Sequence, residues 1–343
     1  MNELCKIENE IVSEENIYKD IKSLILNSRN NVYRAVNTEM LDLYWNIGKR
    51  LMEIQEGSKR AEYGKGIIEK ISSRLTQEYG RGYSIPNLKK MRQFYLSFPI
   101  RSTVLSELSW SHYLILIKIN EENKRKFYMH EAVNSGWSVR ELQRQVDSLL
   151  FERLAISKDK EAMLELANKG ALIKSGKDLV KDPFVLEFLD IKENTEYLES
   201  DLEENLLKHL KEFLLELGKG FMLVGSKVRI TLEDDHFYPD LVFYNRLLKC
   251  FVIIDLKVHK LTHQDIGQMQ MYVNYYDRVI KKEDENPTIG ILLGTSKNET
   301  VVEYTLPKDN ENIYASIYKL GFPTKEELVN LVEQEKQISF LKD

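Results

Sequence analysis

Two carboxylates and a lysine stand close together in the second half of the sequence. Asp240 follows Pro239, and after fourteen further residues Asp255 and Lys257 flank Leu256. Side chains alternate along a strand, so Asp255 and Lys257 are expected on one side of it and Leu256 on the other, in a core. A hairpin between the two segments would fold Asp240 back beside Asp255.

These three side chains together suit the metal-assisted hydrolysis of a phosphodiester. Mg²⁺ prefers oxygen ligands, commonly one or two carboxylates completed by water. A metal-bound water loses its proton more easily, and a lysine ammonium can orient that water or stabilise the charge that develops in the transition state. Because Asp and Lys are common residues, the pattern alone also fits a salt-bridge cluster at the surface of a sheet.

A third carboxylate is expected from the helix that precedes these segments. Its apolar positions recur at helical spacing and are Leu202, Leu206, Leu207, Leu210, Phe213, Leu214 and Leu217. At about 100° per residue, Glu203 falls inside this apolar stripe and Glu204 outside it. A buried carboxylate is costly without a partner, and a metal beside Asp240 and Asp255 would be one. The alternative is an exposed acid at the helix start, where the helix dipole favours it.

Gln268 and Tyr272 follow the lysine and are four residues apart, so they share one face of a helix. Both could form hydrogen bonds near the carboxylates or to a phosphate, and local packing is the competing interpretation. The candidate metal ligands are Glu203, Asp240 and Asp255. The candidate catalytic residues are Glu203, Asp240, Asp255, Lys257 and Gln268.

The elements that must hold these residues form an α/β unit. One helix is expected over residues 202–217, ended by Gly218, and others over residues 264–280 and about 324–336. Strands are expected over residues 221–230, 238–244, 250–258 and 288–293. Short links predict antiparallel hairpins between the first three strands, and the helical link predicts a parallel crossover to the fourth.

The first half of the sequence is expected to be helical. Apolar residues recur at helical spacing over residues 16–56 and 64–79. Gly80 ends the second helix, and Ser84 caps the next one, which has Pro86 in its first turn. A helix, a tight glycine turn and a basic helix are typical of a helix-turn-helix.

The basic helix supplies candidate contacts to a nucleic acid. Basic side chains would contact phosphates, and Asn87, Lys90 or Gln93 could read bases. The candidates are Arg81, Asn87, Lys89, Lys90, Arg92 and Gln93. An ordinary solvated helix face is the competing interpretation.

The charge of the chain is unevenly distributed. The net charge is −5, but residues 59–92 contain nine basic and three acidic side chains, whereas residues 187–204 contain eight acidic side chains and one lysine. A nucleic-acid-binding face depends on such local charge rather than on the total. The net charge therefore does not exclude a nucleic-acid partner.

Composition limits the class of protein. With 343 residues, of which 43% are hydrophobic and 30% charged, the chain can form two folded domains and is not a disordered polypeptide. No apolar run predicts a membrane span, and the N-terminal residues do not resemble a signal peptide. Cys5 and Cys250 give no disulfide framework, so a cytoplasmic location is expected.

The motifs together resemble the YhcG family of the PDDEXK nuclease superfamily. In the second half, the resemblance is carried by residues 213–221, 237–245, 255–257, 267–272 and 286–291. In the first half, the segments similar to that family's N-terminal domain are residues 63–66, 78–84, 87–88, 91–95, 108–113 and 136–142. The resemblance covers about residues 18–335, which is nearly the whole chain.

This resemblance implies a mostly α, winged-helix-like N-terminal domain and an α/β C-terminal domain with a restriction-endonuclease-like mixed sheet flanked by helices. It also implies Mg²⁺-dependent nuclease chemistry, with Asp240, Asp255 and Lys257 at the core positions of the superfamily and Glu203 as its helical acid. The sequence departs from the family at Asp255, where relatives often have Glu, and at residues 261–264, where relatives tend to carry a proline.

We therefore expect a helical DNA-binding domain over residues 16–155, a connecting segment over 156–195 and a nuclease domain over 196–340. The expected function is metal-dependent cleavage of DNA, with Mg²⁺ or Mn²⁺ as cofactor. The alternative is a catalytically silent nucleic-acid-binding or assembly protein on a nuclease scaffold. RNA as substrate and a homodimer as the assembly state are left open, and no membrane association is expected.

Overall fold

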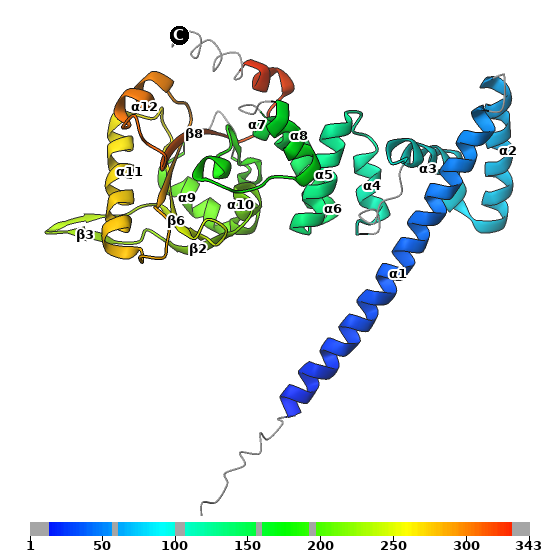
Figure 1. Ribbon diagram of the computed structural model, residues 1–343, viewed down its shortest axis with the longest axis horizontal. Helices are drawn as coiled ribbons and strands as arrows, with labels where there is room; N and C mark the ends of the chain where they lie inside the picture. Colours follow the sequence, from blue (N-terminus) through cyan, green and yellow to red (C-terminus); the bar gives the residue numbers. More distant parts are fainter. Residues whose placement is uncertain (1–13, 57–60, 100–106, 156–159, 192–196, 331–343) are drawn as a thin grey trace, which may run out of the picture. The chain divides into compact units, whose positions relative to one another are not determined.

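A computed structural model describes most of the chain (Figure 1). The described residues are 14–56, 61–99, 107–155, 160–191 and 197–330. The chain divides into two compact units, residues 1–122 and residues 123–343, and each is considered by itself. The domain limits expected from the sequence stay a prediction. None of the described helices is long and apolar enough to cross a membrane.

The first unit is built from helices. They are α1 (Glu14–Glu56), α2 (Ala61–Tyr79), η1 (Arg81–Tyr83), α3 (Ile85–Ser97) and α4 (Trp110–Leu116). A small core of Leu51, Ile68, Leu88 and Met91 joins the first three α-helices. At Gly48, α1 approaches α3 so closely that a Cβ would lie 2.2 Å from the Met91 carbonyl oxygen, which explains the glycine there.

The predicted helix, glycine turn and helix are present as α2, η1 and α3. Gly80 has a φ of 89° and ends α2, as expected for a glycine after the last helical residue. Ser84 precedes α3, but its side chain forms no capping hydrogen bond, so the predicted cap is wrong in that detail. All regular elements described between residues 14 and 155 are helices, so the strands of a winged helix are not confirmed.

The second unit combines helices with a mixed sheet (Figure 1). Its helices before the sheet core are α5 (Glu122–Ser135), α6 (Val139–Asp147), α7 (Leu150–Ala155), α8 (Lys160–Lys169), η3 (Gly176–Leu179), η4 (Glu187–Leu189), α9 (Glu199–Lys208) and α10 (Leu210–Leu217). The later helices are α11 (His263–Tyr275), η5 (Tyr276–Ile280) and α12 (Glu299–Thr305). The α/β class expected for this part of the chain is confirmed.

Six strands form the sheet in the order β1-β8-β7-β6-β5-β2. They are β1 (Phe184–Val185), β2 (Phe221–Ser226), β5 (Leu241–Asn245), β6 (Cys250–Leu256), β7 (Ile289–Gly294) and β8 (Ile313–Lys319). Strands β2, β5 and β6 are antiparallel, and β7 pairs parallel with β6 after the crossover through α11, as predicted. A separate hairpin contains β3 (Ile230–Leu232) and β4 (Asp235–Phe237).

The structure differs from the sequence prediction in several elements. The strand expected over 221–230 ends at Ser226, because the chain leaves the sheet there and forms the β3–β4 hairpin. The helix expected over 202–217 is interrupted at His209 and forms α9 and α10. Strands β1 and β8 were not expected. Residues 325–330 of the expected last helix are helical, and its remainder lies outside the described residues.

The sheet lies between two apolar layers. Phe213 of α10 and Leu206 of α9 pack against one face of the sheet, with Phe243 and Ile254. Met269 of α11 packs against the other face, with residues such as Val242 and Ile253. Neighbouring residues in a strand therefore face different helices, which positions the polar residues at the strand ends.

Candidate active site

The two predicted aspartates meet at one end of the central hairpin. Leu241 of β5 pairs with Ile254 of β6, so the next positions in register are Asp240 and Asp255. The Leu256 backbone N–H donates a 2.7 Å hydrogen bond to Asp240 Oδ2. Both carboxylates are buried, with 4% of Asp240 and 2% of Asp255 exposed. The sequence prediction that the hairpin brings them together is confirmed.

Lys257 lies on the same side as Asp255, as the strand alternation predicts. Its Nζ is 2.8 Å from Asp255 Oδ2, an ion pair without the alignment of a hydrogen bond. Leu256 points the other way, into the core beside α9 and α10. Burial lowers the pKa of Lys257, but the Asp255 carboxylate outweighs it and raises that pKa above its usual value.

Burial also raises the pKa of Asp255, to about 6, and the nearby Asp240 carboxylate adds to the effect. The Lys257 ammonium acts in the opposite direction. Asp255 Oδ2 has no hydrogen-bond partner in the described part of the chain. A buried carboxylate oxygen that repels its neighbour in this way is suited to a bound cation, which would favour its charged form.

Glu203 reaches the same region from α9 and is only 7% exposed, as its place in the apolar stripe predicts. Glu204 is exposed and pairs with Lys208 at 2.8 Å, which confirms it as a solvated neighbour. Burial raises the pKa of Glu203, whereas Lys227 lowers it. The choice of Glu203 over Glu204 as the inward-facing acid is therefore confirmed, and its role stays a prediction.

Lys227 is a member of this cluster that the sequence reasoning missed. Its Nζ lies 3.0 Å from Glu203 Oε2 and also pairs with Asp240 Oδ1. The Lys227 backbone N–H donates a 3.0 Å hydrogen bond to the Asp240 carbonyl oxygen, which continues the β2–β5 pairing by one residue. An ammonium thus stands between the two carboxylates that were predicted to share a cation.

Glu199 was also missed. It is the first residue of α9, one helical turn before Glu203, and its Oε2 is 3.5 Å from Lys257 Nζ. Its Oε1 is 3.7 Å from His259 Nε2. The four-residue spacing between Glu199 and Glu203 would have placed both on one face, had the helix been expected to begin before Leu202.

Gln268 is connected to the cluster through Tyr272. Its Nε2 donates a 2.8 Å hydrogen bond to the Tyr272 hydroxyl, so the predicted shared face of α11 is confirmed. Burial raises the pKa of Tyr272 to about 12, and the Asp255 carboxylate contributes. The structure gives Gln268 a positioning contact, and its catalytic role stays a prediction.

The carboxylate oxygens of the cluster are suitable ligands for a divalent cation. Within the described ranges, no group of three or more His, Cys, Asp or Glu is arranged to hold a metal ion. Lys227 lies between Glu203 and Asp240 and pairs with both, so its single positive charge offsets part of their negative charge. Oxygen donors from Asp240, Asp255 and Glu203 are nevertheless the type that Mg²⁺ prefers.

The predicted nucleic-acid residues divide into two groups. Arg81, Lys89, Lys90 and Gln93 are exposed around η1 and α3. Asn87 is half-buried, and its amide donates to the Gly82 carbonyl oxygen at 3.2 Å, which closes the turn before α3. Arg92 is half-buried as well. Asn87 therefore has a local structural function, and the exposed group is better placed for contacts to phosphates.

Comparison with known proteins adds a family to this geometry. Residues 177–333 match the family described as YhcG PDDEXK nuclease domain, and residues 20–153 match the DUF1016 N-terminal domain. The Escherichia coli (strain K12) protein named "Putative nuclease YhcG" is 36% identical over 349 residues, which cover 92% of each chain.

Two solved structures show a more limited likeness. A repair endonuclease from Pyrococcus abyssi is 20% identical, with a TM-score of 0.27 over 38% of this chain and 50% of that one. A structure of an EndoMS–dsDNA complex is 15% identical, with a TM-score of 0.26 over 39% of this chain and 51% of that one.

Proposed function

Because the chain belongs to the YhcG family of PDDEXK nucleases, we propose that it hydrolyses phosphodiester bonds in DNA with the help of Mg²⁺ or Mn²⁺. The observation that carries the proposal is the meeting of Asp240, Asp255 and Lys257 at one end of the β5–β6 hairpin. All three side chains are buried there, although charged residues are rarely buried without a functional or structural reason.

In this proposal Asp240 and Asp255 hold the cation, and Glu203 is a further ligand or binds it through water. When bound, a divalent cation would lower the pKa of a water molecule and neutralise charge on the phosphate. Lys257 orients the attacking water and stabilises developing negative charge. Gln268 supports this arrangement through Tyr272.

The exposed basic residues of the first unit are proposed to bind the DNA backbone. Arg81, Lys89 and Lys90 would contact phosphates, with Arg92 beside them, whereas Gln93 remains a candidate for base contacts. Asn87 would act by holding the turn that presents this face. Such contacts contribute affinity that decreases with salt concentration.

The test is cleavage of a DNA panel by the full-length protein. We expect products from plasmid, linear or branched DNA with Mg²⁺ or Mn²⁺ and none with excess EDTA, since both aspartates need a cation to bind the scissile phosphate. An RNA panel run in parallel tests the substrate class. Nucleic-acid binding without cleavage under all metal conditions would instead support the silent scaffold protein.

A substitution of Lys227 tests the proposed cation site independently of cleavage. The Lys227 ammonium lies between Glu203 and Asp240 and would have to move for both carboxylates to hold one cation. We expect Lys227→Met to bind Mn²⁺ about tenfold more tightly in calorimetric titrations, because it removes a competing positive charge.

The matched control is Lys208→Met, which removes an exposed lysine paired with Glu204 on the same helix as Glu203. This variant should bind Mn²⁺ like the wild type. Weaker Mn²⁺ binding by Lys227→Met would contradict the idea that the Lys227 ammonium competes with the cation, and would indicate that Lys227 supports the site.

Homodimer formation and the cytoplasmic location stay predictions.

A further inference from the structure

A cavity of about 470 Å³ lies in the second unit, away from the carboxylate cluster. Its lining includes Trp137, Leu150, Ile173, Lys181, Leu217 and Arg246. Arg246 directly follows β5, whereas Asp240 directly precedes that strand. Six residues of extended chain span about 20 Å. The cavity is therefore at the opposite end of the central hairpin from the candidate active site.

The cavity is lined by a buried lysine, Lys181. Only 6% of Lys181 is exposed, and its ammonium forms no hydrogen bond or ion pair within the described chain. Its backbone is held, because the Ser316 hydroxyl donates a 2.6 Å hydrogen bond to the Lys181 carbonyl oxygen. An unpaired buried charge is costly, so this ammonium favours an anion beside it. Burial lowers its pKa to about 8; the Glu216 carboxylate opposes this shift, and Arg153 and Arg144 add to it.

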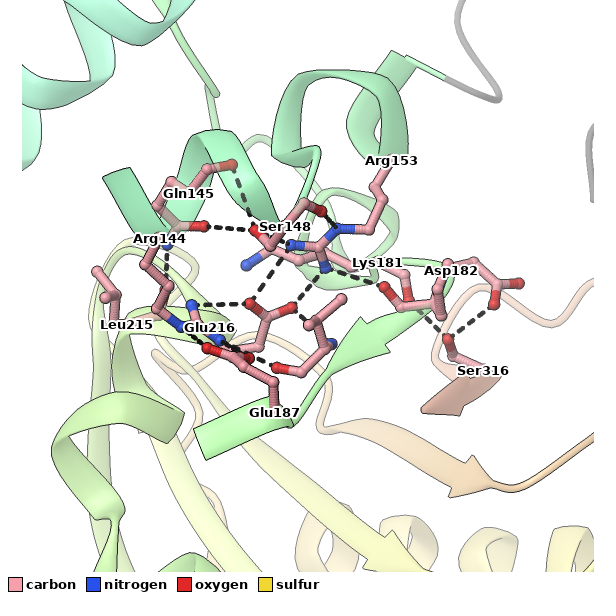
Figure 2. A network of polar contacts seen from close by, with 12 residues as sticks. Arg144, Gln145, Ser148, Arg153, Lys181, Asp182, Glu187, Leu215, Glu216 and Ser316 are labelled. Atoms are coloured by element: carbon pink, nitrogen blue, oxygen red, sulfur yellow. Dashed lines mark hydrogen bonds and ion pairs between the residues drawn. The ribbon is translucent and has the colours of Figure 1, made fainter. Parts of the chain in front are cut away.

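The nearest buried carboxylate is already engaged by two arginines (Figure 2). Glu216 pairs with Arg153 at 2.5 Å and with Arg144 at 3.2 Å. Arg144 also pairs with Glu187 at 2.6 Å. These four side chains balance one another, with two positive and two negative charges. Lys181 adds a further positive charge, so the five side chains together carry one excess positive charge.

The carboxylates that line the cavity are engaged as well. Glu131 accepts a 2.6 Å hydrogen bond from the Ala171 backbone and pairs with Lys219 at 2.7 Å. Glu141 accepts from the Ser138 backbone at 2.7 Å in its capping box. Asp178 accepts from the backbone of residues 174 and 175, at 3.0 Å each. In the described part of the chain, none of these carboxylates forms an ion pair with Lys181, although the charge of Glu131 acts on it from a distance.

The Lys181 ammonium can be approached past Gly218, and the other walls of the cavity near it are apolar. Gly218 has a φ of 105°, and a Cβ there would lie 3.9 Å from Lys181 Nζ. A side chain at this position would extend toward the ammonium, so glycine leaves the approach free. Leu150, Leu214 and Leu217 supply apolar walls.

We propose that this cavity binds a small monocarboxylate with an apolar body, whose carboxylate pairs with Lys181. One unpaired ammonium matches one negative charge, and a charge-assisted hydrogen bond in a buried site is strong. A phosphate monoester carries nearly two charges at neutral pH and would need a second buried cation beside Lys181, whereas Arg246, which also lines the cavity, is exposed. The apolar walls match a short hydrocarbon chain.

Calorimetric titration of the full-length protein with octanoate tests this proposal. We expect one saturable site per chain, with octanol and octyl phosphate binding at least tenfold more weakly. Lys181→Met should weaken octanoate binding at least tenfold. Lys177→Met removes an exposed lysine from the same segment and should leave binding unchanged. A second variant, Leu154→Trp, narrows the cavity without touching Lys181 and should also weaken binding.

Three results would overturn the proposal. They are the absence of saturable octanoate binding to the wild type, unchanged binding in Lys181→Met, and tighter binding of octyl phosphate than of octanoate. If Lys181→Met fails to fold, unchanged octanoate binding by Leu154→Trp would still refute the proposal that octanoate binds in this cavity.

Discussion

Replacing Lys257 by alanine is expected to reduce DNA cleavage about a thousandfold, within the range seen when a group that stabilises transition-state charge is removed. The Lys257 ammonium is held 2.8 Å from Asp255 Oδ2 and is almost fully buried, so no other described lysine can take its place without moving. Lys227 is the nearest candidate, but it is bound to Glu203 and Asp240. The measurement is the single-turnover cleavage rate at saturating Mg²⁺.

The accompanying measurements separate catalysis from folding and from metal binding. Lys257→Ala should keep its Mn²⁺ site, because the proposed ligands are carboxylates, and should remain folded at the assay temperature, although the loss of a buried ion-pair partner lowers its melting temperature. The control Lys308→Ala removes an exposed lysine elsewhere in the same unit and should cleave at the wild-type rate. Equal rates for wild type and Lys257→Ala would remove Lys257 from the mechanism.

Local patterns in the sequence were sufficient to predict the side-chain directions that depend on a single strand or helix. Strand alternation predicted that Asp255 and Lys257 share a side, and helical phase predicted that Glu203 is buried and Glu204 exposed. The hairpin prediction brought Asp240 to Asp255, because few residues separate the two strands.

Lys227 could not be found in the same way, because its position depends on where β2 ends and on how β2 pairs with β5. The prediction ran that strand on to residue 230, which would have placed Lys227 inside the strand. The family resemblance named core positions of the superfamily and did not include this lysine. Its assignment needed the pairing of Lys227 with Asp240 across the sheet edge.

No local sequence pattern predicts the charged network around Glu216. Arg144 and Arg153 come from helices more than sixty residues before Glu216 in the sequence, and each contact joins distant segments. Expectations based on composition treat such residues as surface charges. Only tertiary packing determines that Arg153 and Glu216 are buried together.

Breaking this network should give the largest loss of stability in the chain. Glu216 and Arg153 side chains are fully buried, and Glu216 also accepts a 3.1 Å hydrogen bond from the Val185 backbone (Figure 2). Glu216→Leu leaves Arg153 without its carboxylate partner and removes one of the two carboxylates that pair with Arg144. Removing one partner of a buried pair typically costs about 3–5 kcal/mol. We expect calorimetric melting of this unit to shift down by roughly 10 °C.

The loss of stability in Glu216→Leu can come from the lost ion pair or from the unpaired charge left on Arg153. The double variant Arg153→Met, Glu216→Leu distinguishes these two causes. Since it removes one charge of each sign, its melting temperature should lie above that of Glu216→Leu alone. Glu204→Leu, which breaks the exposed pair with Lys208, is the control and should change stability by less than about 1 kcal/mol. A double variant less stable than both Glu216→Leu and Arg153→Met alone would instead show that the two losses add independently and that an unpaired charge is not the main cost.

Acid provides a second measure of the same interaction. Burial raises the pKa of Glu216, but Arg153, Lys181 and Arg144 outweigh it and hold the value at about 2. The unfolded chain binds this proton near the ordinary value of 4.5, so the contribution of Glu216 is complete above that pH and is lost as pH falls toward 2. Stability should therefore decrease more steeply between pH 5 and 3 in the wild type than in Glu216→Leu. Parallel slopes would mean that the carboxylate is not held ionised by its arginines.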